Sequence, residues 1–194
     1  MYEFADSVVR YIDKQLIMRY FRLKSLVSFD EINILQSVNA LYQELDVIVR
    51  KMFLSIARKA YLQTAKHDYG SIDEEWVDNL LEGYDPVSKY VFTHEWDRKS
   101  ARLIEAIIAS VTKTAEIDAD MRSLSRMIRA YSIRITDEAV LQAFRDDGAR
   151  YVRWVTERDT KTCSVCRSRD GKQYTLYGLP PKPHINCRCW YERA

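Results

Sequence analysis

Residues that break regular secondary structure are scarce in this sequence. Only five glycines and four prolines occur among 194 residues, and three of the prolines are Pro180, Pro181 and Pro183. This scarcity argues against long disordered segments and favours long helices. Uncharged apolar runs are also short. None approaches the length of about 18 residues that a membrane-spanning helix needs, so we expect no membrane association.

A secretory signal is also missing, because no basic segment followed by an apolar core occurs among the first residues. We therefore expect the protein to stay in a reducing cytoplasm. Cysteine is absent from residues 1–162, and all four cysteines lie within 163–189. In a reducing compartment, clustered cysteines bind metal more often than they form disulfides.

Positive and negative charges are nearly balanced, since the formal net charge is only +2. The basic residues are nevertheless concentrated near the C-terminal end, where eleven Lys/Arg oppose six Asp/Glu from Arg145 onward. A basic segment of this size can contact nucleic acid or an acidic partner, and it is equally typical of a solvated surface.

Helical periodicity dominates residues 1–148, where apolar residues recur at intervals of three and four. The longest such pattern covers 31–67. A pattern of more than about 25 residues predicts either a helical hairpin or a helix that packs on another chain. Further helices are expected over 86–111 and 118–133.

Capping residues predict where some of these helices begin and end. Ser71 and Glu74 have the spacing of a capping box for a short helix. Thr136 and Asp137 can cap a last helix, which should end at Gly148 because glycine easily adopts the left-handed conformation that follows many helices.

The pattern changes after Gly148 from helical spacing to alternation. The segment YVRWVTERD alternates apolar and polar residues, which predicts a strand, CSVC predicts a turn, and KQYTLY and INCRCWYE predict two more short strands. The expected fold is therefore α+β, with a predominantly helical body over 1–148 and a small β-rich module over 149–194. A module of about 45 residues is too small to bury a hydrophobic core that would stabilise it alone, so it needs a cross-link such as a bound metal ion or a disulfide.

The cysteines can provide such a cross-link. Cys163 and Cys166 have the C-x-x-C spacing that presents two sulfurs to one ion. Cys187 and Cys189 would lie on one face of a strand and could point at the same ion. His184 is a fifth candidate, either as an alternative fourth ligand or as a partner of a ligand. We predict a structural Zn²⁺ site formed by the four cysteines, with His184 as the alternative.

Other roles remain open to these cysteines. Disulfides between the two pairs would join the same segments but need an oxidising environment. A redox C-x-x-C usually begins a helix in a β-α-β unit, whereas the flanking segments here have strand patterns. Elsewhere, His94 and Glu95 lack the second histidine of H-E-x-x-H, since Arg98 stands in its place. Carboxylate pairs such as Asp146 and Asp147 are typical of helix caps and solvated surface. We find no catalytic constellation and predict that the protein is not an enzyme.

Three motifs occur in order in the C-terminal segment: D-x-K-T-C-x-x-C at 159–166, D-G-K at 170–172, and H-x-N-C-R-C at 184–189. Together with the aromatic strand that precedes them, they resemble the C-terminal half of the phage Mu F-like head morphogenesis domain. The resemblance covers about residues 122–190 and is carried mainly by the C-x-x-C and H-x-N-C-R-C motifs.

This resemblance implies a minor capsid component of the virion that is assembled in the infected bacterial cytoplasm. The implied partners are the portal protein, the capsid protein, or both. The implied role is head morphogenesis, with DNA packaging or delivery, rather than catalysis.

We hypothesise that basic residues of the module meet the portal protein or packaged DNA, while the long helices pack on partner subunits or self-associate. These residues are Arg153, Arg158, Arg167, Arg169, Lys172 and Arg188. The alternative is a zinc-ribbon nucleic-acid-binding protein unrelated to virions, whose affinity for DNA should fall steeply with salt.

Overall fold

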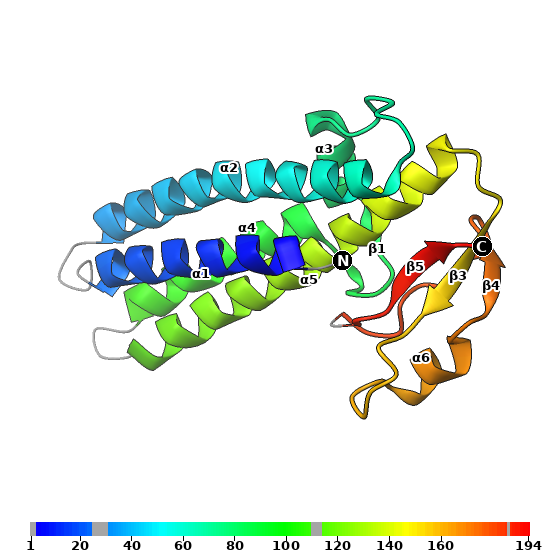
Figure 1. The fold of residues 1–194 in the computed structure, drawn as a ribbon. Coiled ribbons are helices and arrows are strands. Elements are labelled where there is room, and N and C mark those ends of the chain that lie inside the picture. Colours follow the sequence, from blue (N-terminus) through cyan, green and yellow to red (C-terminus); the bar gives the residue numbers. More distant parts are fainter. Residues whose placement is uncertain (1–2, 25–30, 110–113, 186) are drawn as a thin grey trace.

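The structure is a computed structural model that describes residues 3–24, 31–109, 114–185 and 187–194. A body of long helices is followed by a small C-terminal module with a three-stranded sheet (Figure 1). The helices are α1 (Glu3–Lys24), α2 (Glu31–Thr64), α3 (Glu74–Glu82), α4 (Phe92–Ala109), α5 (Thr114–Asp146) and α6 (Ser164–Arg169). The strands are β1 (Tyr84–Asp85), β2 (Tyr90–Val91), β3 (Tyr151–Val155), β4 (Gln173–Thr175) and β5 (Trp190–Arg193). The predicted α+β fold is confirmed.

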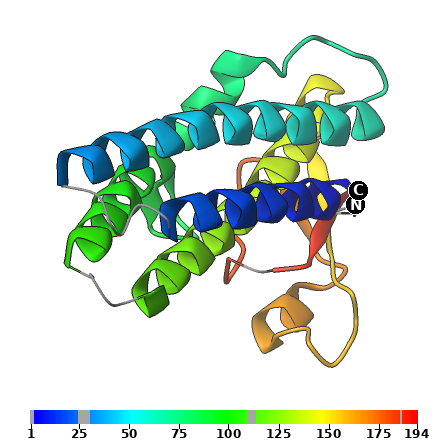
Figure 2. The same ribbon diagram turned by 90° about the vertical axis from the view of Figure 1, so that its left-hand side faces the viewer.

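Helix α2 is a single helix of 34 residues and not a hairpin. Its buried residues, such as Leu45, Val49 and Phe53, recur at helical spacing along one face. Helices α1, α4 and α5 of the same chain contact α2, and Figure 2 shows these long helices packed together. No helix in the described part of the chain combines the length and apolar character needed to cross a bilayer.

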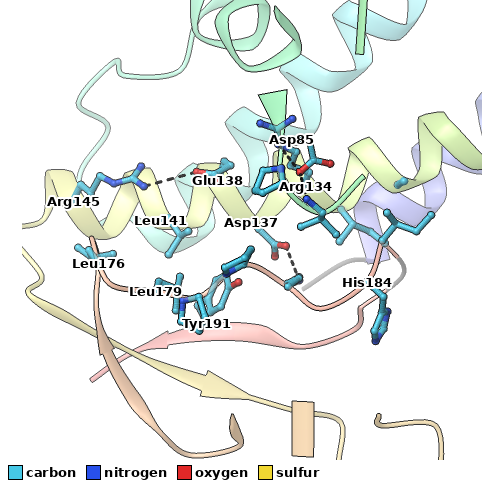
Figure 3. Close-up of a pocket in the computed structure, with 18 residues that line it drawn as sticks. Asp85, Arg134, Asp137, Glu138, Leu141, Arg145, Leu176, Leu179, His184 and Tyr191 are labelled. Atoms are coloured by element: carbon cyan, nitrogen blue, oxygen red, sulfur yellow. Dashed lines mark hydrogen bonds and ion pairs between the residues drawn. The ribbon is translucent and has the colours of Figure 1, made fainter. Parts of the chain in front are cut away.

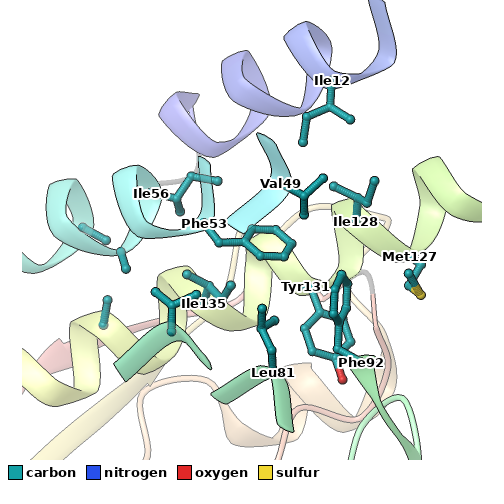
Figure 4. Close-up of a cluster of buried hydrophobic side chains, with 14 of the residues drawn as sticks. Ile12, Val49, Phe53, Ile56, Leu81, Phe92, Met127, Ile128, Tyr131 and Ile135 are labelled. Atoms are coloured by element: carbon teal, nitrogen blue, oxygen red, sulfur yellow. The ribbon is translucent and has the colours of Figure 1, made fainter. Parts of the chain in front are cut away.

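The centre of the helical body is an aromatic and aliphatic cluster (Figure 4). The ring of Phe92, at the start of α4, lies 5.6 Å from the ring of Phe53 on α2 and 4.7 Å from that of Tyr131 on α5, measured between centroids. Aromatic pairs of this kind contribute about 0.5–1.5 kcal/mol beyond the burial of their area. The cluster therefore ties three helices together at one level.

Two predicted helix starts are wrong. Helix α3 has Asp73 as its N-cap, with the Asp73 carboxylate accepting the Trp76 N–H at 2.8 Å, so Ser71 does not cap it. The helix expected from residue 86 begins only at Phe92. The reason is that the Asp85 carboxylate accepts the backbone N–H groups two and three residues further on, which closes a turn between β1 and β2.

The two helices expected over 118–133 and 137–148 form one continuous helix, α5. Thr136 and Asp137 therefore lie inside a helix and do not cap one. The Thr136 hydroxyl donates to the carbonyl oxygen four residues earlier at 2.8 Å, and Asp137 is buried. The predicted end is confirmed: Gly148 has a φ of +70°, and its N–H donates to the carbonyl oxygen three residues earlier at 2.9 Å.

The sheet of the module has β3 at its centre, with β4 and β5 paired to it antiparallel. Val152 and Trp154 are buried, whereas Tyr151 and Arg153 are exposed, so the predicted alternation of buried and exposed side chains is present. Trp154 lies opposite Tyr191 of β5. Strand β5 contacts α5, and the buried side chains of the module belong to the same hydrophobic cluster as those of the helices.

Candidate metal centre

Two loops of the module present the cysteines. Cys163 is the N-cap residue of α6, with Cys166 in its first turn, so the C-x-x-C segment begins a helix instead of forming an isolated turn. Cys187 and Cys189 lie just before β5 and not within a strand. Both predictions of local structure were therefore wrong. The sulfurs still converge, because strand pairing in the sheet brings the two loops together.

Backbone N–H groups at the start of α6 point at the sulfur of Cys163. The N–H of Cys166 donates to Cys163 Sγ over 3.4 Å. This hydrogen bond is the main reason that the pKa of Cys163 is lowered; burial opposes it, and the Val165 N–H and the charge of Arg169 assist it. The loop therefore favours a thiolate, which is the form that binds metal.

Five potential ligand atoms gather between the loops. The sulfurs of Cys166, Cys187 and Cys189 all lie within 4.8 Å of one another, and Cys163, Cys166 and His184 form a second group with the same limit. Cys166 belongs to both groups, and its sulfur is 3.4 Å from that of Cys187. In a tetrahedral zinc site with Zn–S bonds of about 2.3 Å, sulfurs are about 3.8 Å apart. Within each group of three, the donor atoms are therefore close enough together to share one zinc ion.

Unlike the loop at Cys163, burial favours the neutral thiol form of Cys166 and Cys189. Burial raises the pKa of the Cys166 thiol, and hydrogen bonds with the neighbouring thiols raise it further. Burial likewise raises the pKa of Cys189. No S–S bond joins the four cysteines, all of which lie in the described residues. Adjacent buried thiols can ionise together only if a cation balances their charge, and a divalent ion would do so.

A buried donor next to the cluster fits the same conclusion. The indole N–H of Trp154 is buried and makes no hydrogen bond of regular geometry with any described residue. Although burial raises the pKa of Cys189 overall, the Trp154 side chain is among the groups that lower it. A thiolate sulfur accepts hydrogen bonds better than a thiol does. An ionised, metal-bound Cys189 would therefore satisfy this donor.

His184 differs from the cysteines in its surroundings. It is exposed and groups with Cys163 and Cys166, whereas Cys187 and Cys189 complete the buried group. The structure thus places the predicted alternative ligand on the solvent side of the cluster and Cys189 on the protein side. Cys189 is therefore a member of the buried donor group and His184 of the other group, and Cys166 belongs to both.

Asp159, the first residue of the D-x-K-T-C-x-x-C motif, holds the two ligand loops together. Asp159 accepts the Lys161 N–H at 3.1 Å and both of its carboxylate oxygens lie 2.7 Å from Arg188 Nη2. Arg188 is the residue between Cys187 and Cys189, so this ion pair joins the loop before α6 to the loop before β5. The Arg188 guanidinium is also the main reason that the pKa of Asp159 is lowered. An aspartate two residues before a turn N–H is a recognisable signal of this kind.

Most of the six basic residues predicted to face a partner make contacts within the module. Arg158 pairs with Asp170 at 2.8 Å and Arg188 pairs with Asp159. Arg167 donates to the carbonyl oxygen of residue 162 at 3.0 Å, and Arg169 donates to that of residue 181 at 2.8 Å. The remaining two residues, both exposed, are Arg153 and Lys172.

Comparison with known proteins adds no relative: no protein-family model matches the chain, and no curated protein or solved structure is significantly similar to it. The features that bear on function are therefore those of the chain itself. Its most distinctive chemical feature is a compact group of sulfur donors with three buried members, Cys166, Cys187 and Cys189.

Proposed function

We propose that this protein binds one structural Zn²⁺ ion, which fixes the small module on the end of the helical body. The donor set carries the proposal, because Cys166, Cys187 and Cys189 place three sulfurs within 4.8 Å of one another and Cys163 and His184 stand beside them. Sites rich in thiolate favour zinc among the common divalent ions, and four protein ligands leave no position open for a substrate. The ion would therefore have a structural role.

Zinc binding can supply a free energy on the order of 10 kcal/mol to hold such a site together. The binding energy would hold the loop before α6 against the loop before β5, which the ion pair between Asp159 and Arg188 already joins. The outer face of the sheet, with exposed Arg153 and Tyr151, would then be a rigid surface for a partner.

We propose further that the protein is a non-catalytic minor head component of a bacteriophage or prophage, acting in head morphogenesis with the portal or capsid protein. Support comes from the place of the motif residues. Asp159 of the first motif pairs with Arg188 of the last, and Cys163 of the first motif lies in one donor group with His184 of the last. Asp170 of the D-G-K motif pairs with Arg158. The C-x-x-C and H-x-N-C-R-C motifs, which mainly carry the resemblance, thus meet at the proposed zinc site.

Metal analysis of the purified protein tests the first proposal. We expect about one equivalent of zinc in the wild type, and a loss of zinc in Cys166→Ser and Cys187→Ser. Ser168→Ala on the same short helix is a matched control that should keep its zinc, since the Ser168 hydroxyl only donates to a backbone carbonyl of that helix. A wild-type protein that is metal-free while its thiols are reduced would overturn the proposal.

Co-purification with the portal protein of the parent phage or prophage tests the second. We expect a complex with the zinc-loaded wild type, and its loss in Cys166→Ser. A DNA titration over a range of salt concentrations separates the other class of function. High affinity for DNA that falls steeply with salt, without binding to portal or capsid protein, would replace the virion role by nucleic-acid binding.

A further inference from the structure

The loop between β4 and the ligands His184 and Cys187 is anchored to the helical body by a buried ion pair. Lys182 Nζ lies 2.5 Å from Asp137 Oδ2 of helix α5, and the two side chains are only 7% and 9% exposed. Figure 3 shows Asp137 directed from α5 toward this loop. Removing two charges from water costs several kcal/mol per ion. Because each of these buried charges depends on the other for compensation, the ion pair favours one position of the loop against α5.

The same loop is held from the module side. Arg169 of α6 donates to the carbonyl oxygen of Pro181 at 2.8 Å, and its guanidinium stacks over the Trp154 ring at 4.9 Å. Lys182 Nζ also lies over the ring of Tyr191, 5.6 Å from its centroid. The residues on either side of the Pro181–Lys182 peptide bond are therefore fixed to three different elements, α5, α6 and β5.

Lys182 is close to the metal ligands both along the chain and in space. It stands two residues before His184 and five before Cys187. Lys182, His184 and Tyr191 line the same cavity of about 410 Å³ between α5 and this loop, and His184 also belongs to the donor cluster. Because a single residue separates Lys182 from His184, a change in the position of Lys182 would be transmitted directly to this candidate ligand.

We propose that Lys182, through its ion pair with Asp137, is a positioning residue for the metal centre: it sets the path of the ligand loop and couples zinc binding to the docking of the module on α5. This inference rests on the proposed zinc site and deepens it. Coupling of this kind is reciprocal, so zinc binding strengthens the attachment of the module to α5 by as much as the attachment strengthens zinc binding.

Zinc affinity, measured by competition with a chelator, and the absorption spectrum of the Co²⁺-substituted protein test the proposal. Lys182→Met keeps the apolar stem and removes the charge. We expect about 10- to 100-fold weaker zinc binding, as for other residues that orient metal ligands, together with a changed cobalt ligand-field band. Asp137→Asn keeps the shape of the partner and should change both readouts in the same direction by a smaller amount.

Leu45→Ala is the control for a general loss of stability, because Leu45 is fully buried in α2 and belongs to the helical body. It should lower the thermal midpoint and leave zinc affinity within about twofold of the wild type. The proposal is overturned if Lys182→Met lowers the midpoint with unchanged zinc affinity and cobalt spectrum. If Lys182→Met does not fold, the same result for Asp137→Asn overturns it. A wild type that binds no zinc would instead refute the metal site itself.

Discussion

Replacing Trp154 by phenylalanine should affect the metal-loaded protein much more than the metal-free protein. The Trp154 side chain is fully buried and packs edge-on against Tyr191, with ring centroids 5.4 Å apart. Phenylalanine keeps an aromatic ring in this place and removes the indole N–H, which makes no regular hydrogen bond with the described residues. The substitution therefore isolates the contribution of one buried donor.

The two states should respond differently for a simple reason. In the metal-free protein, removing a buried donor without a regular acceptor recovers about 1–3 kcal/mol, which offsets the smaller ring and the weaker contact with Arg169. We expect the free energy of unfolding to change by about 1 kcal/mol or less. In the metal-loaded protein, a hydrogen bond from Trp154 to a charged sulfur of Cys189 is worth about 1.5–3 kcal/mol. Its loss should weaken zinc binding by about 10- to 100-fold.

Urea unfolding with and without zinc, combined with chelator competition, measures both quantities. Trp96→Phe is the matched control, because Trp96 is buried in the helical body against Tyr42, with centroids 5.4 Å apart. Trp96→Phe should lower the free energy of unfolding by the same amount in the metal-free and the metal-loaded protein, and it should leave the zinc affinity unchanged. An equal loss with and without zinc in Trp154→Phe would refute the assignment of Cys189 as the acceptor and metal ligand.

Three further outcomes are expected. Phe92→Ala should lower the free energy of unfolding in urea by about 3–5 kcal/mol, because its fully buried ring contacts three other aromatic rings, those of Phe53, Trp96 and Tyr131; a loss below about 1 kcal/mol would contradict this packing. Zinc affinity should fall between about pH 8 and 6. Burial raises the pKa of Cys166 and of Cys189, so binding must release protons, and a pH-independent affinity in chelator competition would argue against these ligands. Asp159→Asn should lower the thermal midpoint at neutral pH. Arg188 lowers the pKa of Asp159 in the folded protein. The stability that this carboxylate contributes is therefore present above the unfolded-state pKa of about 3.9 and is lost as the pH falls through the lower folded-state pKa. A difference in thermal midpoint between wild type and variant that persists below the folded-state pKa would count against the ion pair.

Periodic patterns were the part of the sequence that predicted structure best. The apolar spacing over 31–67 predicted helix α2, and the alternation after Gly148 predicted strand β3. In both elements the burial of each side chain follows from its position in the helix or strand, so a short window of sequence contains the information. The same holds for Gly148, whose positive φ depends on its own lack of a side chain.

Capping signals were less reliable, because several residues compete for each cap. Ser71 and Asp73 both precede α3, and the Asp73 carboxylate makes the hydrogen bond. Thr136 and Asp137 have the composition of a cap inside α5, where the helix continues because Ile135 and Ala139 on either side are fully buried. Tertiary packing therefore overrode a local preference that is worth only about 1 kcal/mol.

Partners distant along the chain could not be predicted at all. Asp146 and Asp147 had the pattern of caps and solvated surface, yet Asp146 accepts the Tyr61 hydroxyl at 2.6 Å and Asp147 accepts the Lys66 N–H at 3.1 Å. Asp147 also pairs with Arg193 of β5. These contacts join α2 and the residues just after it to the C-terminal end of α5 and to β5. Nothing near Asp146 or Asp147 in the sequence indicates which carboxylate will have such partners.

The sequence alone determined that this protein has long helices, a C-terminal β-containing module, and sulfur donors concentrated in that module, because spacing and composition are local properties. Only the tertiary structure decided how the donors meet: Cys166 joins both groups, Cys189 lies on the protein side with Trp154, and His184 lies toward solvent. The physical reason is that strand pairing brings the two loops together, and the buried ion pair of Lys182 with Asp137 joins one of them to α5; both contacts are between residues far apart in the chain.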